Sequence, residues 1–386
     1  MNAFLSFLIS FVLALTLTPL VRKMASKMDA MCYPSERSVH KKPIPYLGGV
    51  AIYISSVAAI LLIGPQDKST QQAIIWGGLI IVIIGIIDDL YSLKPWQKIL
   101  GQVASAVCVV ALGVDVTFIK DPFTGSIRFL GVLAVPLTIL WIVCFENVIN
   151  LSDGLDGLAA GISGITALVT VFASAKAGRP AVSLAAAALA GSVFGFLPYN
   201  FHPASIFMGD AGAMYLGLVL GVISVQGLVK STVALAVLAP ILALLVPISD
   251  AAFAIVRRRA SGKSISSADR DHIHHRLLDL GLDHRQAVIT IYVVSGGFGL
   301  LGVLSAFLPV SSSTVIAGLA VAGLFVVAHR IGILTIPKSD GTGEGSDAEE
   351  RESVMPGAGT SKHDDSRGKS GVRADASGMK SSRNQR

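Results

Sequence analysis

Carboxylate and histidine side chains gather in this sequence at the ends of long apolar runs. They form four groups: Asp88 and Asp89; Asn150, Asp153 and Asp156; Asp210; and His272, His274 and His275. If each apolar run crosses a bilayer, successive crossings place all four groups on one membrane face. Charged groups beside a bilayer are costly and usually functional, so the pattern indicates metal-dependent chemistry on a membrane-borne substrate.

The acidic pair follows the apolar run Trp76–Ile87. Adjacent residues of a helix lie roughly 100° apart around its axis, so only one of Asp88 and Asp89 can face a given partner squarely. The pair could act as a base or position a metal ion and a phosphate, or it could simply be the polar end of a helix. Lys94 and Lys98 come next, where they could bind phosphate or anchor the helix at lipid head groups.

The segment 147–157 is dense in Asn, Asp and Gly. Asp153 and Asp156 are three residues apart and would share one helical face, while glycines let the backbone approach a ligand closely. The segment differs from a calcium-binding loop because no acid follows at the twelfth position. Capping of the next helix by Asp153 is the alternative role.

The loop 199–212 contains Asp210 between glycines and has no Lys or Arg. An acid without a basic neighbour is free to bind a hard cation such as Mg²⁺, which takes one or two carboxylates together with substrate phosphates. Phe207 in the same loop could stack on a nucleobase, or it could only anchor the loop at the membrane interface.

The last group places three histidines between two arginines: His272, His274 and His275 lie between Arg270 and Arg276. The segment lacks the paired histidines with an intervening Glu of a zinc protease helix, and the arginines would repel a cation. Histidine beside arginine suits a diphosphate better. A solvated basic loop is the alternative.

The elements that position these groups are membrane helices. Hydrophobic residues make up 52% of the chain and charged residues 15%, which is typical of a polytopic membrane protein and not of a soluble domain. The sequence predicts an all-α fold with about eleven transmembrane helices. The predicted spans are 3–21, 46–64, 73–90, 99–116, 129–149, 158–174, 181–197, 213–229, 232–256, 287–308 and 314–333.

The orientation follows from the distribution of Lys and Arg outside the tail. With the N-terminus outside, sixteen lie on the inner side and six on the outer side, the six being Lys68, Lys120, Arg128, Lys176, Arg179 and Lys230. This asymmetry obeys the positive-inside rule, so all four polar groups are predicted to be cytoplasmic. The run 3–21 is predicted to be a retained span, because its basic residues follow it.

The cysteines and the C-terminal region carry little chemistry. Cys32, Cys108 and Cys144 are odd in number and scattered, so they predict neither a disulfide framework nor a metal knuckle. From 337 onward the chain is rich in Gly, Ser and charge. We therefore predict a membrane-embedded domain over 1–336 and a disordered cytoplasmic tail over 337–386.

Together the four groups resemble the polyprenyl-phosphate N-acetylhexosamine-1-phosphate transferases of glycosyltransferase family 4. The resemblance covers roughly residues 1–333 and includes Pro34-x-x-Arg37-x-x-His40, Asp88-Asp89, the segment 147–157 and Phe207-Met208-Gly209-Asp210. The segment 269–277 is similar to the branch that transfers GlcNAc-1-phosphate, whereas the phospho-MurNAc-pentapeptide translocase branch carries three consecutive histidines. Pro247-x-x-Asp250 fits the GlcNAc branch, and Cys32, Glu146 and Ala213 depart from the family pattern.

The resemblance implies a reaction of UDP-GlcNAc with undecaprenyl phosphate that gives undecaprenyl-diphospho-GlcNAc and UMP, in a cytoplasmic cleft open to the inner leaflet. Asp210 would hold Mg²⁺, or alternatively Mn²⁺, with Asn150 as a second ligand. Asp88 would orient or deprotonate the lipid phosphate, and Asp89 would support it. The uridine would lie among Lys41, Asp153, Asp156, Asn200 and Phe207, and the diphosphate and sugar among His272, His274, His275 and Arg270 or Arg276.

Two other functions are weighed against this one. The translocase that uses UDP-MurNAc-pentapeptide differs only in the histidine motif. A secondary transporter would keep its ionisable groups near the membrane midplane in broken helices, whereas here they lie at helix ends. The expected partners are the two substrates and the lipid bilayer, with no nucleic acid, and a homodimer is left open.

Overall fold

The computed structural model of the chain describes residues 1–34, 42–64, 67–120, 126–229, 235–260, 272–305, 308 and 310–330. Lys41, Arg270 and the tail predicted over 337–386 lie outside these residues. The helices are α1 (Asn2–Lys27), α2 (Gly48–Ile63), α3 (Lys68–Gln72), α4 (Gly78–Tyr91), α5 (Pro95–Ala111), α6 (Ala134–Leu151), α7 (Leu158–Lys176), α8 (Pro180–Asn200), α9 (Gly209–Val229), α10 (Leu235–Ala243), α11 (Leu245–Ala260), α12 (Ile273–Asp279), α13 (His284–Ser305) and α14 (Val310–Arg330).

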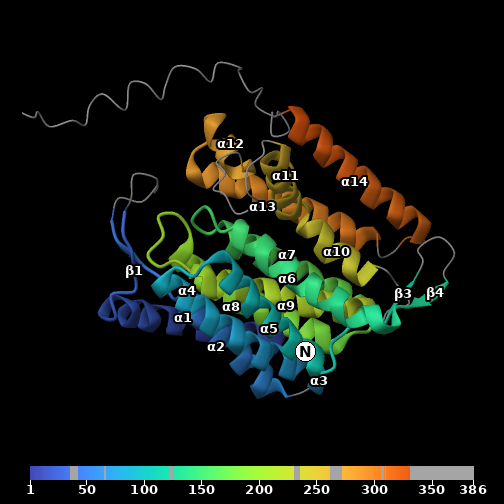
Figure 1. Cartoon of the computed structure of the whole chain (residues 1–386), viewed down its shortest axis with the longest axis horizontal. Helices are drawn as coiled ribbons and strands as arrows, with labels where there is room; N and C mark the ends of the chain where they lie inside the picture. Colours follow the sequence, from blue (N-terminus) through green and yellow to red (C-terminus); the bar gives the residue numbers. More distant parts are fainter. Residues whose placement is uncertain are drawn as a thin grey trace, which may run out of the picture. The chain divides into compact units, whose positions relative to one another are not determined.

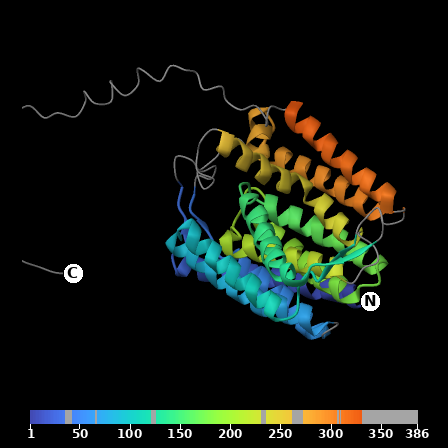
Figure 2. The ribbon, with the colours of Figure 1, turned by 45° about the vertical axis from the view of Figure 1, so that its right-hand side comes forward.

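The strands form two short antiparallel hairpins beside this helical body (Figure 1). One pairs β1 (Met31–Cys32) with β2 (Ile44–Pro45), and the other pairs β3 (Phe118–Lys120) with β4 (Ile127–Phe129). A π-helical turn over Ala73–Gly77 joins α3 to α4. In both ribbon views β3 and β4 lie at the end of the helices opposite β1 (Figures 1 and 2).

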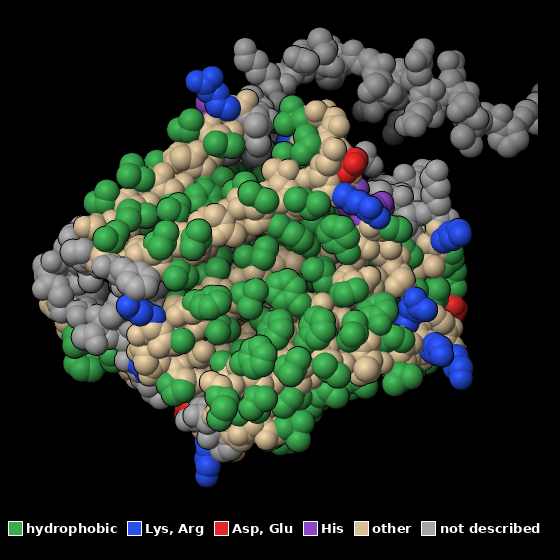
Figure 3. Space-filling model, turned by 180° about the vertical axis from the view of Figure 1, so that it is seen from behind, with side chains coloured by type: hydrophobic (Ala, Val, Ile, Leu, Met, Phe, Trp, Pro, Cys, Tyr) green, Lys and Arg blue, Asp and Glu red, His purple; other side chains and the backbone are tan. Residues whose placement is uncertain are grey.

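The protein is an all-α polytopic membrane protein. Seven of the described helical segments are long and apolar enough to cross a membrane: Asn2–Lys27, Lys68–Tyr91, Gly131–Leu151, Leu158–Lys176, Pro180–Asn200, Gly209–Gly227 and His284–Ser305. Two shorter apolar helices cover Gly48–Ile63 and Ser312–Val327. Hydrophobic side chains cover one broad face of the molecule, while Lys and Arg lie toward its edges (Figure 3), as expected for a surface in contact with lipid.

The run predicted as one span over 232–256 is instead two helices, α10 and α11, which meet at Leu244. Pro247 lies in the first turn of α11, has no N–H to donate to the carbonyl of Ala243, and its ring crowds that carbonyl. The helix therefore breaks near Ala243 and restarts at Leu245.

Helix α9 lies at the centre of the fold and is almost entirely buried over Gly209–Gly227. It packs against α2, α4 and α6, and small residues allow the backbones to touch. A Cβ atom at Gly49 would lie 2.2 Å from the nitrogen of Gly212, and one at Gly85 would lie 2.2 Å from the Cα of Ala211. This close packing brings the last turn of α4 against the first turn of α9.

Candidate active site

Asp89 joins α4 to the start of α9. Its Oδ1 accepts a hydrogen bond from the backbone N–H of Asp210 at 2.8 Å, and its Oδ2 accepts one from Ala211 at 3.4 Å. A carboxylate from a different helix thus caps α9, where the helix dipole favours negative charge. Gly209 has φ +72° and a Cβ there would lie 2.4 Å from Asp89 Oδ2, so this turn requires glycine.

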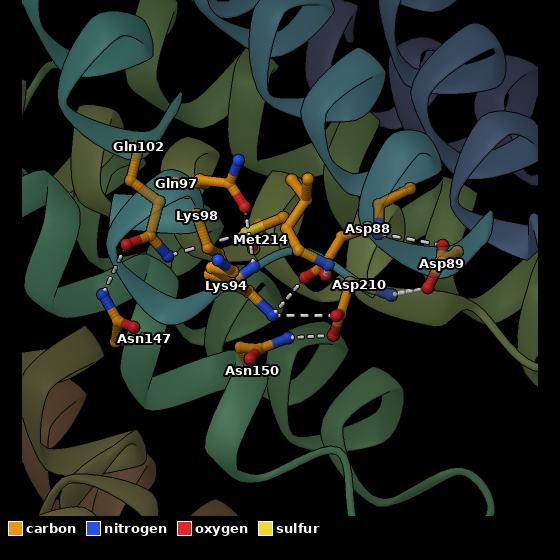
Figure 4. A network of polar contacts seen from close by, with 12 residues as sticks. Asp88, Asp89, Lys94, Gln97, Lys98, Gln102, Asn147, Asn150, Asp210 and Met214 are labelled. Atoms are coloured by element: carbon orange, nitrogen blue, oxygen red, sulfur yellow. Dashed lines mark hydrogen bonds and ion pairs between the residues drawn. The ribbon is translucent and has the colours of Figure 1, made fainter. Parts of the chain in front are cut away.

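Lys98 of α5 bridges the two remaining carboxylates (Figure 4). Its Nζ lies 2.9 Å from Asp88 Oδ2 and 2.8 Å from Asp210 Oδ2. Asp88 is held from the other side, because its Oδ1 accepts the backbone N–H of Leu93 at 2.8 Å. One ammonium group therefore holds α4, α5 and α9 in register at the site.

Asn150 brings α6 to the same cluster. Its Nδ2 donates to Asp210 Oδ1 at 2.6 Å, so both carboxylate oxygens of Asp210 have partners. One turn earlier, Asn147 Nδ2 donates to Gln102 Oε1 at 2.9 Å, which ties α6 to α5. The structure thus brings Asp88, Asp89, Asn150 and Asp210 together at the ends of three helices.

The charge of this cluster suits a divalent cation. Two carboxylates contact the ammonium group of Lys98 and a third, Asp89, caps α9 beside them, and carboxylate and amide oxygens are the ligands that Mg²⁺ prefers. The position between Asp88 and Asp210 already holds one positive charge, that of Lys98. The residues present therefore fit a magnesium ion, with the carboxylates of Asp88 and Asp210 nearest to that position.

Asp153 follows in the loop between α6 and α7. Burial, together with the negative charges of Asp210, Asp89 and Asp156, raises the pKa of Asp153 to about 8. The residue that precedes α7 is Gly157, and no side chain caps that helix. The capping role considered for Asp153 is therefore wrong, and the side chain is a partly buried acid beside the cluster.

Asp156 contacts the loop between α8 and α9. Its Oδ2 lies 2.8 Å from Nδ1 of His202 and accepts the backbone N–H of Ala204 at 3.1 Å. Asn200 is buried and donates from Nδ2 to the carbonyl of Ile206 at 3.1 Å, which fixes the same loop. In this structure both side chains bind protein groups and shape the loop.

Phe207 is half-buried at the end of that loop, beside Tyr46 at a ring distance of 6.3 Å. Its backbone N–H donates to Pro45 at 2.9 Å and its carbonyl accepts from Gly48 at 3.0 Å. The loop that leads to Asp210 is thus fixed to the segment between β2 and α2.

The histidine motif is ordered by Asp250 of α11. Asp250 Oδ2 lies 3.1 Å from His272 Nδ1, and its Oδ1 accepts the backbone N–H of Ile273 at 2.9 Å. The ring of His274 stacks on that of His272 at 5.5 Å and contacts that of His275, tilted, at 4.4 Å. Burial lowers the pKa of His274 to about 4, so this imidazole is neutral at pH 7. Arg276 is half-buried on α12.

His274 also links this motif to the loop after α6. A Cβ atom at Gly154 would lie 2.5 Å from Nε2 of His274, so the glycine is what allows the imidazole to lie against the loop backbone. The histidine motif is therefore adjacent to the segment that carries Asn150 and Asp153.

The sequence alone does not predict the partners of two residues at the site. For Lys98 it offers phosphate binding or lipid anchoring, whereas in the structure the ammonium group pairs with two carboxylates. Asp250 enters only as part of a motif, although an acid inside the apolar run 233–256 is itself a signal of function.

Comparisons with known proteins support the family resemblance that these motifs indicate. Residues 72–228 match glycosyl transferase family 4. Over 299 residues the chain is 41% identical to a Bacillus subtilis (strain 168) protein named probable undecaprenyl-phosphate N-acetylglucosaminyl 1-phosphate transferase, covering 78% of this chain and 84% of that protein. It is 37% identical over 338 residues to a decaprenyl-phosphate N-acetylglucosaminephosphotransferase of Mycolicibacterium smegmatis, covering 80% and 83%.

The similarity to a second group is weaker. A phospho-N-acetylmuramoyl-pentapeptide-transferase of Clostridium botulinum is 29% identical over 223 residues, which cover 55% of this chain and 69% of that protein.

Proposed function

This chain belongs to glycosyl transferase family 4, and from that premise we propose that it transfers GlcNAc-1-phosphate from UDP-GlcNAc to undecaprenyl phosphate, with UMP as the second product. The observation that carries the proposal is the cluster at helix ends in which Lys98 pairs with Asp88 and Asp210, Asn150 donates to Asp210, and Asp89 accepts the backbone N–H of Asp210. The names of the relatives with higher identity support GlcNAc as the sugar.

The reaction is a phosphoryl transfer, which depends on positioning and on neutralisation of charge. An oxygen of the lipid phosphate attacks the phosphorus that carries GlcNAc, and the bond from that phosphorus to the oxygen of UMP breaks. The lipid phosphate, with a second pKa near 6, is already largely ionised at neutral pH. Asp88 therefore orients the nucleophile more than it deprotonates it, and direct displacement is favoured over an aspartyl-phosphate intermediate.

Asp210 would hold Mg²⁺, with Mn²⁺ as the alternative and Asn150 as a second ligand. When bound, the ion supplies charge neutralisation to the diphosphate. Asp89 positions Asp210 through the backbone of α9, and Lys98 offers a positive charge to an incoming phosphate. His272, His274, His275 and Arg276 would contact the diphosphate and sugar, while the loops that carry Asp153, Asp156, Asn200 and Phe207 would surround the uridine, with the Asp156 carboxylate turned toward His202.

The site would open on the cytoplasmic face, toward the inner leaflet, in a bundle of about eleven spans. The bundle would consist of the seven long apolar segments and the two shorter ones, together with α5 and with the broken pair α10 and α11, which would cross as one span. The basic loops on this side support the orientation.

Purified full-length protein in detergent, given radiolabelled UDP-GlcNAc and undecaprenyl phosphate, should place label on the lipid and release UMP. An excess of unlabelled UDP-MurNAc-pentapeptide should leave the rate unchanged. In the reverse experiment, label arriving on the lipid from the pentapeptide donor would assign the chain to the translocase branch instead.

A further inference from the structure

Three potential metal ligands meet beside the active site, on three different segments. Asp156 belongs to the loop after α6, His202 follows α8, and His284 is the first residue of α13. Their ligand atoms all lie within 4.8 Å of one another. The rings of His202 and His284 stack at 4.2 Å, and His202 Nδ1 lies 2.8 Å from Asp156 Oδ2.

His284 provides an independent indication of a ligand. Both of its ring nitrogens are shielded from solvent, and neither makes a hydrogen bond of good geometry among the described residues, although the backbone of Asp156 lies close to the ring. Buried polar groups without partners are rare because each costs about 1–3 kcal/mol. An ion bound between the two imidazoles and the carboxylate would satisfy one of these nitrogens.

The ligand types identify the class of ion. Mg²⁺ and Ca²⁺ prefer oxygen ligands, whereas imidazole suits Zn²⁺ and related transition metals. We propose that Asp156, His202 and His284 form a Zn²⁺ site that is separate from the cluster around Asp210. Two imidazoles and one carboxylate would leave the fourth tetrahedral position to water.

The neighbouring charges allow such a site. Arg285 follows His284, but it is exposed and its Nε donates to the carbonyl of His202 at 3.0 Å. Asp283, on the other side of His284, contributes a negative charge and accepts from the backbone of Gln286 at 2.7 Å. The arginine is thus held against the backbone, and the acid offsets part of its charge.

A zinc ion here would hold together the two loops that frame the active site. The loop after α6 carries Asp153 and directly follows Asn150, which is in the last turn of α6, and the loop after α8 leads to Asp210. Helix α13 already contacts both, through Arg285 in its first turn and through Tyr292 two turns later, whose hydroxyl donates to the carbonyl of Gly157 at 2.5 Å. The proposed role of the ion is therefore structural.

The test measures zinc binding directly, so its outcome is independent of whether the transfer reaction is found. Full-length protein carrying a tag without histidine is stripped with a chelator and then titrated with Zn²⁺ against a chromophoric zinc indicator. We expect one tight equivalent, a rise in Tm on loading, and a tetrahedral visible spectrum with Co²⁺.

His284→Gln and His202→Gln should each lower the zinc affinity by at least about tenfold and abolish the zinc-dependent rise in Tm. His329→Gln, which changes an exposed histidine on α14, is the matched control and should behave as wild type. Variants are compared only if their metal-free Tm matches that of the wild type; otherwise His284→Asn replaces His284→Gln.

Two results would overturn the proposal. One is a wild-type protein that binds no zinc at micromolar concentration. The other is zinc binding that survives His284→Gln and is lost in His272→Gln, which would move the ion to the histidine motif.

Discussion

At the scale of single residues, the three carboxylates of the cluster have different partners and therefore different roles. Asp89 binds backbone N–H groups of α9, Asp88 binds Lys98 and the backbone of Leu93, and Asp210 binds Lys98 and Asn150. Asp89 is a positioning residue, whereas Asp88 and Asp210 present oxygens to the ammonium group of Lys98, beside which the proposed cation would bind.

Asp210→Asn should lower turnover by at least about a hundredfold, because it removes the charge that would hold the metal ion. The radiolabel assay with a thermal melt checks both activity and folding. EDTA should abolish the activity of the wild type until Mg²⁺ is restored. The control variant Asp279→Asn changes an exposed acid at the end of α12, and it should change neither the activity nor the Tm. Full activity in EDTA would exclude the metal role.

Asp153 should make stability depend on pH. Its pKa in the folded protein, about 8, lies above the ordinary value of about 3.9, so the folded state binds the proton more tightly than the unfolded state. As the pH rises from about 4 to about 8, the ionisation of Asp153 therefore lowers the free energy of unfolding of the protein. The Tm of Asp153→Asn should exceed that of wild type by more at pH 8 than at pH 5. A Tm difference that is the same at both pH values would contradict this.

The grouping of the acids could be predicted from sequence, and their pairing could not. The ends of successive apolar runs alternate between the two membrane faces, so counting the runs is enough to predict that Asp88 and Asp210 lie on the same face. Lys98 pairs with both only because α5 folds back beside α4, and nothing local distinguishes it from Lys94. The function of Asp250 likewise depends on where α12 packs.

At the scale of elements, helix contacts made through glycine fix the distance between the acids. A Cβ atom at Gly85 would meet the backbone of Ala211 at 2.2 Å, so even one methyl group forces α4 away from α9. Overpacking of this kind costs typically 1–3 kcal/mol.

Gly85→Ala should therefore lower Tm by at least about 3 °C and reduce transfer activity, since Asp88 and Asp89 move relative to Asp210. Gly323→Ala in α14 is the matched control, because a Cβ there meets nothing within 4 Å. Its Tm should be unchanged or higher, because alanine favours the helix. Equal Tm values for the two variants would mean that α4 and α9 do not touch here.

The positions of the helices could be predicted from the sequence, because long apolar runs leave few alternatives to a helix. Each predicted run overlaps a described helix. The break at Leu244 could not be predicted, since Pro19 and Pro198 lie inside α1 and α8 without ending them. Whether a proline interrupts a helix depends on which neighbours satisfy the freed carbonyl.

At the scale of the whole molecule, the polar groups lie toward one end of the helices. The hairpin of β3 and β4 lies at the other end in both ribbon views (Figures 1 and 2). With the excess of basic residues on the side of the polar groups, this arrangement predicts the orientation in the membrane.

Reporter fusions after Lys98, Asn200 and Lys263 should all report a cytoplasmic position, and a fusion after Lys120 should report an external one. The measurement is the ratio of a reporter active only inside the cell to one active only outside. An external signal at Lys263 would overturn the proposed placement of the active site.

The burial of α9 has a consequence for drug resistance. Around Asp210, Gly209 and Gly212 have no room for a larger side chain, because a Cβ at either would meet Asp89 or Met208 within 3 Å. An inhibitor that binds against this turn would contact positions where substitution disturbs helix packing as well as chemistry. Few escape mutations would leave a folded protein there, whereas the exposed outer helices tolerate change.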